Sequence, residues 1–155
     1  MAEHIWTVLC ARSLVDADTN NVSLIDVIEQ LTLTGDPPDI PPDGKPIILA
    51  GIQLTVVSLW TRTDPAQPDR VTFRVIVITP DGKRIIPKEE HELDLESHRR
   101  VRVFVRLNSF PYRGPGDYEW LIEERQQTKS GKPKWTKVAR IPLEIRFAKP
   151  EQGSK

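Results

Sequence analysis

Apolar and charged side chains alternate with a period of two in residues 99–107 and 117–125, which Gly114-Pro115-Gly116 separates. Alternation of this kind is typical of β-strands that are buried on one face only. The apolar positions of the two stretches are Val101, Val103, Val105 and Leu107, then Tyr118, Trp120 and Ile122. An antiparallel sandwich, in which each sheet buries one face, is therefore the leading interpretation.

Six further strands are predicted from the same pattern and from the turn residues between them. They cover residues 5–14, 22–33, 47–60, 71–78, 84–95 and 135–147. Residues 16–21 are rich in Asp and Asn, which tolerate a positive φ, so the first two of these strands are expected to form a hairpin. Residues 47–60 are apolar on both faces, which predicts a central strand, and Gly51 is a candidate site for a bulge.

The fold class predicted from these strands is all-β, a two-layer antiparallel Greek-key sandwich of about eight strands, immunoglobulin-like. A closed small barrel is the alternative. The segment Pro115-Gly116-Asp117-Tyr118 favours the sandwich, because it resembles the corner of immunoglobulin-type folds where a tyrosine opens the strand that crosses between sheets. A single domain is expected over residues 1–149, with a disordered tail at 150–155.

The charge and the cysteine content of the chain indicate which binding partners and which cellular compartment to expect. Lysine plus arginine equals aspartate plus glutamate at 22 each, so no overall positive field attracts phosphate backbones or anionic lipid. Met1-Ala2-Glu3-His4 is not a basic segment followed by an apolar run, so no signal sequence is expected, and no segment approaches the roughly 20 apolar residues that span a bilayer. Cys10 is the only cysteine, and its apolar surroundings predict a buried thiol. A cytoplasmic protein without membrane contact is expected.

Short motifs along the chain are shared with a known group of proteins. They are the hairpin from Leu14-Val15-Asp16 to Thr19-Asn20-Asn21-Val22-Ser23-Leu24-Ile25, the turn Pro80-Asp81-Gly82, the segment Pro115-Gly116-Asp117-Tyr118 and the closing Ile141-Pro142-Leu143. With these motifs, nearly the whole chain resembles a family of small bacterial β-sandwich proteins of unknown function. The resemblance implies the sandwich fold and a bacterial origin, and it supplies no catalytic residue.

One face of the strand at residues 99–107 carries arginines around an aromatic ring, namely Arg100, Arg102, Phe104 and Arg106. Such a face can bind phosphates or other anions through guanidinium groups while the ring stacks on a base. Alternatively, it is a solvated surface whose arginines pair with neighbouring carboxylates, and Arg74 is expected on a neighbouring strand. The corner at Gly116 decides between the two, because a crossing corner separates the arginines from Glu119 and Glu123.

Residues 89–98 mix carboxylates with two histidines, His91 and His98. On one strand these histidines would face opposite sides, so they could bind a single ion only if the segment bends. A metal-dependent hydrolase using His91, His98 and nearby carboxylates is the alternative function from a different class. Because no phosphate-binding loop, nucleophile elbow or paired cysteine ligands occur, no catalytic, cofactor-binding or metal-ligating residue is assigned.

Two further features suit contact with proteins. Residues 34–46 contain five prolines and three aspartates, which predicts a long exposed loop, and Pro38-Asp39-Ile40-Pro41 has the spacing of a polyproline ligand. Trp6 and Trp120 are expected in the core, whereas Trp60 and Trp135 lie near strand ends where an indole can be half exposed.

The function predicted is that of a non-catalytic interaction module that assembles with itself or binds another protein. Unpaired sheet edges and half-exposed aromatic rings are the physical basis. The candidate contact residues are Trp60, Trp135, Phe104, Arg100, Arg102 and Arg106. Binding of an anion or a nucleic acid through the arginine face is a second alternative, although the balanced charge argues against nucleic acid. No cofactor is expected.

Overall fold

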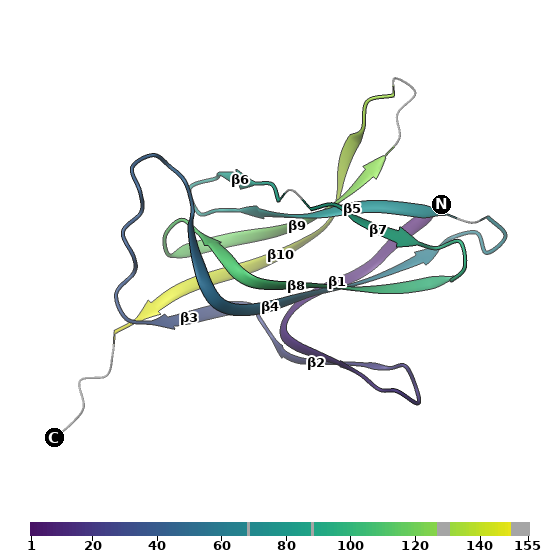
Figure 1. Ribbon diagram of the computed structural model, residues 1–155, viewed down its shortest axis with the longest axis horizontal. Helices are drawn as coiled ribbons and strands as arrows, with labels where there is room; N and C mark the ends of the chain where they lie inside the picture. Colours follow the sequence, from purple (N-terminus) through teal and green to yellow (C-terminus); the bar gives the residue numbers. More distant parts are fainter. Residues whose placement is uncertain (68, 88, 127–130, 150–155) are drawn as a thin grey trace.

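Two β-sheets pack face to face in the computed structural model, which describes residues 1–67, 69–87, 89–126 and 131–149 (Figure 1). Sheet A contains, in spatial order, β2 (Val22–Val27), β1 (Ala2–Val15), β4 (Ile47–Arg62) and β8 (Arg100–Tyr112). Sheet B contains β3 (Gln30–Thr34), β10 (Lys134–Ala148), β9 (Gly116–Gln126), β5 (Arg70–Ile78) and β6 (Arg84–Ile85), and β7 (His91–Asp94) also pairs with β5. The predicted all-β sandwich is confirmed.

The described residues form ten strands rather than about eight, because two predicted strands are each divided. The strand expected at 22–33 becomes β2 in sheet A and β3 in sheet B. The chain changes sheets at Ile28, whose N–H donates to the carbonyl of Leu9 at 2.8 Å, and β3 then runs parallel to β10. The expectation of purely antiparallel pairing is therefore wrong at this one pair. The strand expected at 84–95 is divided near Pro87, which has no N–H for a ladder bond.

The core lies between the sheets and contains the apolar rows expected from the sequence. Val105 is buried, and Val101, Val103 and Leu107 pack against the core from β8. From sheet B the core receives Val71, Phe73, Val75, Val77, Tyr118, Trp120, Ile122, Leu143 and Ile145. The strand alternation therefore gives the inward face correctly in both sheets.

Two tryptophans differ from their predicted positions. Trp60 is fully buried, with its ring 5.6 Å from that of Phe73, because β4 continues to Arg62 and Trp60 does not end the strand. Trp6 is only half-buried and lies on the outer face of sheet A. A β-bulge between His4 and Trp6 is the reason: His4 pairs with Trp60 and Trp6 pairs with Leu59, so two steps along β1 match one step along β4. After the bulge, each following side chain of β1 points to the opposite face from the one that an unbroken alternation would give.

The corner between β8 and β9 crosses from sheet A to sheet B, as the sequence predicted. Gly116 opens β9 with a φ of 129°, a conformation that disfavours other residues. Two residues later, the hydroxyl of Tyr118 accepts the N–H of Arg113 and donates to the carbonyl of Gly114. The tyrosine thus closes the corner in the way seen in immunoglobulin-type folds.

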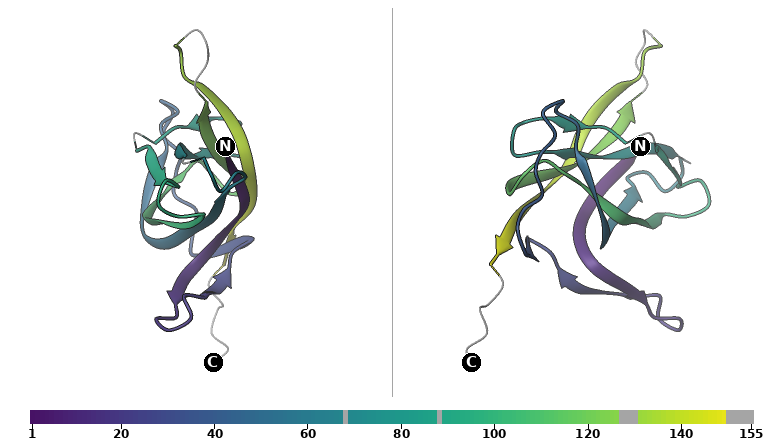
Figure 2. Two further views of the ribbon diagram at one scale, coloured as in Figure 1. Left: turned by 90° about the vertical axis from the view of Figure 1, so that its right-hand side faces the viewer. Right: turned by 60° about the vertical axis from the view of Figure 1, so that its left-hand side comes forward.

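The hairpin of β1 and β2 bends away from the body of sheet A (Figures 1 and 2). β1 pairs with β4 only as far as Cys10, and beyond that residue it pairs with β2 alone. β4 departs from regular pairing with β8 between Ala50 and Leu54, where Gly51 has a φ of 81°. The bulge expected at Gly51 is confirmed, and the bent hairpin leaves a hollow against the outer face of sheet A.

Candidate functional site

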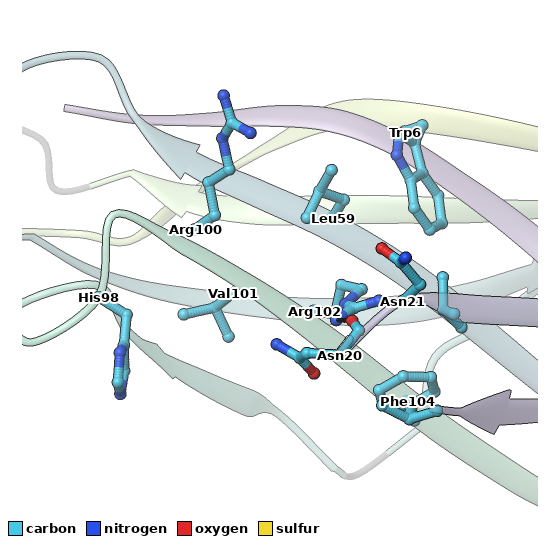
Figure 3. Close-up of a pocket in the computed structure, with 11 residues that line it drawn as sticks. Trp6, Asn20, Asn21, Leu59, His98, Arg100, Val101, Arg102 and Phe104 are labelled. Carbon is cyan, nitrogen blue, oxygen red and sulfur yellow. Dashed lines mark hydrogen bonds between the residues drawn. The ribbon is translucent and has the colours of Figure 1, made fainter. Parts of the chain in front are cut away.

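A groove of about 850 Å³ lies between the outer face of sheet A and the tip of the β1–β2 hairpin. Its walls come from the hairpin, from β4 and from the start of β8, with His98 at one end (Figure 3). The lining side chains used below are Trp6, Asn20, Asn21, Leu59, Arg100, Arg102 and Phe104. We call this hollow the hairpin groove.

Strand register explains how the floor of the hairpin groove is built. Leu59 pairs with Trp6 on one side and with Arg102 on the other, so these three side chains form one row on the outer face. Val57 pairs with Phe104 in the next row and is fully buried although it faces outward. The floor is therefore apolar at its centre, with guanidinium groups along the β8 side.

The opposite wall is the tight turn of the hairpin. Asp16 Oδ1 accepts the backbone N–H groups of Asp18 at 3.1 Å and Thr19 at 2.7 Å, and also the Thr19 hydroxyl at 2.8 Å. Thr19 in this way lowers the pKa of Asp16. Asn20 has a φ of 55°, which Asn tolerates, and its carbonyl oxygen accepts a hydrogen bond from Arg102. The Arg102 guanidinium therefore links the turn to sheet A.

The hairpin groove is positive in charge. Arg100 and Arg102 line it, and no carboxylate is among its lining residues in the described part of the chain. Arg100 makes no ion pair with any residue of the ranges that the structure describes. Arg102 donates one hydrogen bond to Asn20, whereas a guanidinium has five N–H donors. Both side chains thus keep donors for a negatively charged ligand.

The six predicted contact residues do not form one surface. Arg100, Arg102 and Phe104 share the hairpin groove, whereas Arg106 lines a separate hollow of about 320 Å³ next to Arg12. Trp60 is a core residue, so its predicted role in contacts is wrong. Trp135 is half-buried on sheet B, where the guanidinium carbon of Arg74 lies 4.0 Å from the centre of its ring.

The arginine face and the acidic row lie in different sheets, because the Gly116 corner crosses. Arg74 is on β5 of sheet B rather than on a strand beside β8, which corrects the prediction for this residue. It donates to Glu123 Oε2 at 2.8 Å, and Arg84 donates to the other oxygen of the same carboxylate. Burial by itself would raise the pKa of Glu123, but the two guanidinium groups more than offset it and lower that pKa.

The structure does not bring His91 and His98 together. His91 lies 5.1 Å from the ring of Phe73 and lines a cavity at the seam between the sheets, whereas His98 lines the hairpin groove. The ranges that the structure describes contain no group of three or more His, Cys, Asp and Glu side chains that could hold a metal ion. The geometry gives the hydrolase alternative no common site for its two histidines.

A second polar cluster lies inside the sandwich. His4 Nε2 is 2.6 Å from Thr7 Oγ1, which also bonds the hydroxyl of Ser58, and burial lowers the pKa of His4. Ser58 is 1% exposed and the ring of Trp60 packs 5.0 Å from His4. No substrate reaches a hydroxyl so enclosed, so we interpret the cluster as internal hydrogen bonding of a polar position in the core.

Sequence reasoning missed the residues that turn the arginine face into a groove. The alternation predicts Trp6 in the core, because the bulge beside it leaves no mark in the sequence. Asn20 and Asn21 are predicted only as turn residues. One feature of the sequence could have indicated the bent hairpin: the strand continues through residues 11–15 after its apolar run ends. In the structure Leu14 and Val15 are 59% and 49% exposed. A long strand that leaves its sheet carries such exposed apolar side chains.

Comparison with known proteins places the chain in no family. No family model matches it, and no curated protein matches it. Among solved structures, the soluble domain of PmoD from Methylocystis sp. ATCC 49242 (Rockwell) is similar with a TM-score of 0.28 and 10% sequence identity, over 94% of this chain and 98% of that one. Overlap this weak carries no argument about function, and the resemblance to a bacterial β-sandwich family stays a prediction. Within the described residues, no helix is long and apolar enough to cross a membrane.

Proposed function

We propose that the protein is a non-catalytic interaction module that binds an acidic, extended segment of a partner protein in the hairpin groove. One observation carries the proposal: the groove combines two arginines and two asparagines with an apolar floor and has no carboxylate among its described lining residues. The predicted cytoplasmic location belongs to this proposal as well. Each part of the ligand's chemistry follows from a part of the groove.

The negative charge of the ligand follows from Arg100 and Arg102. A guanidinium binds a carboxylate through paired N–H groups, and such charge-assisted bonds are about twice as strong as neutral ones. The link between Arg102 and Asn20 holds the guanidinium in place before the ligand arrives. A side chain fixed in advance loses less conformational entropy on binding.

An extended polypeptide fits the remaining groups better than a nucleic acid does. The side chains of Asn20 and Asn21 can both donate to and accept from a peptide backbone. Trp6, Leu59 and Phe104 offer apolar and aromatic surface, and Leu14 and Val15 stay exposed on the hairpin beside it. A nucleic acid would need a longer track of positive charge than two arginines in a chain of zero net charge.

The test is a titration with short synthetic peptides that repeat aspartate, proline and leucine, followed by isothermal titration calorimetry and by the fluorescence of Trp6. The control peptide carries asparagine in place of aspartate. We expect the acidic peptide alone to bind, and Arg102→Glu to weaken it roughly tenfold or more. Trp6→Phe removes the fluorescence change and keeps the calorimetric signal.

Two results would overturn the proposal. Equal binding of the acidic and the neutral peptide would show that the arginines do not select the ligand. Binding of an oligothymidine strand that weakens steeply with salt, together with no binding of the acidic peptide, would assign the groove to single-stranded nucleic acid instead.

A further inference from the structure

The loop between β3 and β4, residues 35–46, has the chemistry that the hairpin groove requires of its ligand. It contains Pro37, Pro38, Pro41 and Pro42 together with Asp36, Asp39 and Asp43. Asp43 pairs with Lys45 at 3.2 Å, whereas Asp36 and Asp39 are exposed and form no ion pair with the residues that the structure describes. Ile40 adds an apolar side chain that is 41% exposed. The loop therefore presents free carboxylates, proline rings and an aliphatic group.

The loop is also held in place. Lys83 Nζ donates to the carbonyl of Gly44, and Arg113 Nη1 donates to the carbonyl of Lys45 at 3.3 Å. Its prolines have restricted φ, and proline-rich segments adopt an extended conformation that aromatic grooves bind with little ordering cost. The two hydrogen bonds hold the end of the loop at Gly44 and Lys45, and the four prolines restrict the backbone of residues 36–42, which favours a stiff, acidic ligand.

The loop and the hairpin groove lie on different sides of the molecule. Figure 1 shows the loop on the left and the tip of the β1–β2 hairpin at the lower right, and the two are also apart in the right-hand view of Figure 2. A chain cannot place this loop in its own groove. A second copy can, and the zero net charge of the chain is consistent with an acidic end that faces a basic one.

We propose that the hairpin groove of one copy binds residues 36–42 of a second copy, so that the protein associates head to tail. This inference rests on the proposed function and names the partner. The carboxylates of Asp36 and Asp39 face the guanidinium groups of Arg100 and Arg102, and the proline rings lie on Trp6 and Phe104. Because the two contacting surfaces differ, the contact is heterologous and builds a ring or an open chain of copies.

The experiment is sedimentation velocity on the full chain over a range of protein and salt concentrations, with two charge-reversed variants. One variant combines Asp36→Lys with Asp39→Lys, and the other combines Arg100→Glu with Arg102→Glu. We expect the unmodified chain to associate with rising concentration and to dissociate with salt, and each variant to raise the dissociation constant at least roughly tenfold. An equal mixture of the two variants regains association, because each reversed surface then meets its complement.

The matched control for the loop variant is Glu89→Lys with Glu92→Lys, which makes the same change in net charge as that variant at two exposed positions outside the loop and the groove. We expect it to associate as the unmodified chain does. The loop variant alters only exposed loop positions, so a folding defect of the groove variant would still leave one informative arm.

Three results would overturn this inference. They are a chain that stays monomeric at every concentration, a loop variant that associates normally, and a mixture of the two variants that fails to associate although both have the circular dichroism spectrum of the unmodified chain. If any of these occurs while the acidic probe peptide still binds the hairpin groove, the partner is another protein and the proposed function stands. If the probe peptide also fails to bind, both proposals fall.

Discussion

The hydroxyl oxygen of Tyr118 lies 2.7 Å from the carbonyl oxygen of Gly114, to which it donates, and 2.7 Å from the backbone nitrogen of Arg113. Burial raises the pKa of Tyr118 to about 12, so the hydroxyl keeps its proton as a donor at neutral pH. Its ring packs 4.9 Å from that of Phe110. One side chain thus satisfies two backbone groups at the point where the chain leaves sheet A for sheet B.

We expect Tyr118→Phe to lower the free energy of unfolding by about 1 to 3 kcal/mol, because both backbone groups lose their buried partner. Urea unfolding, followed by tryptophan fluorescence, measures the change. The variant keeps the ring and its packing, so the loss reports the hydroxyl alone.

Tyr112→Phe is the matched control for the corner. The Tyr112 hydroxyl is also buried but has no hydrogen-bond partner among the described residues. Removing an unpartnered buried hydroxyl should leave stability unchanged or raise it slightly. Equal losses in the two variants would show that the Tyr118 hydrogen bonds do not stabilise the corner.

The strand alternation predicted the fold because it depends on burial alone. Val71, Phe73, Val75 and Val77 face inward for the same reason as Val101 to Leu107, and turn residues predict the corner at Gly116. Glycine marks the bulge at Gly51, but the sequence does not predict the departures from regular strand structure that no glycine or proline marks. The bulge at Trp6 and the change of sheet at Ile28 depend on tertiary pairing, which alternation does not encode.

The candidate site was predicted only in part for the same reason. Arg100, Arg102 and Phe104 were found because all three share one face of one strand. Trp6 lies beside them on β1, and Asn20 reaches Arg102 from the tip of the β1–β2 hairpin across more than eighty positions of sequence. Local sequence patterns carry no information about contacts of this range.

Glu123 holds two arginines with one carboxylate, and its side chain is only 6% exposed. We expect Glu123→Gln to cost about 3 kcal/mol in stability, because Arg74, itself 15% exposed, keeps a buried charge without its partner. Glu119→Gln is the comparison, since Glu119 pairs with Arg140 at the surface and should matter much less. Chemical denaturation of both variants measures the two losses of unfolding free energy. Similar losses would contradict the distinction between a buried and a surface ion pair.

Because of Asp81, we expect the stability of the protein to depend on pH in the acid range. Hydrogen bonds from Arg113 and Thr79 lower the pKa of Asp81 from 3.8 to about 2. Because the folded pKa lies below the unfolded one, the contribution is fully present above pH 3.8 and disappears as the pH falls to about 2. We expect the free energy of unfolding to fall through this window in urea titrations at successive pH values.

Asp81→Asn tests the origin of that slope. We expect the variant to be less stable at neutral pH and to show a shallower loss of stability between the two pKa values. Arg113→Gln removes the main partner of the carboxylate and should flatten the same window. An unchanged slope in both variants would assign the acid sensitivity to other carboxylates, such as Glu119 and Glu123, whose pKa values are also lowered.

Cys10 should be unreactive in the folded protein. Its side chain is fully buried on the outer face of sheet A, and burial raises the pKa of the thiol, which lowers the fraction of reactive thiolate. We expect Ellman's reagent to label Cys10 slowly in buffer and at once in denaturant. Rapid labelling of the folded chain would show that the β1–β2 hairpin opens at this residue.

Gly51 tests whether the bulge in β4 depends on backbone conformation or on space. Its φ of 81° lies in the left-handed region, yet a Cβ atom added there would meet no heavy atom within 4 Å. Gly51→Ala should therefore cost only the conformational term, about 1 to 2 kcal/mol. Gly51→Asn should cost less, because Asn adopts this region more readily. If both substitutions cost the same in urea unfolding, steric contact rather than φ limits the site, and the bulge is not held by the glycine.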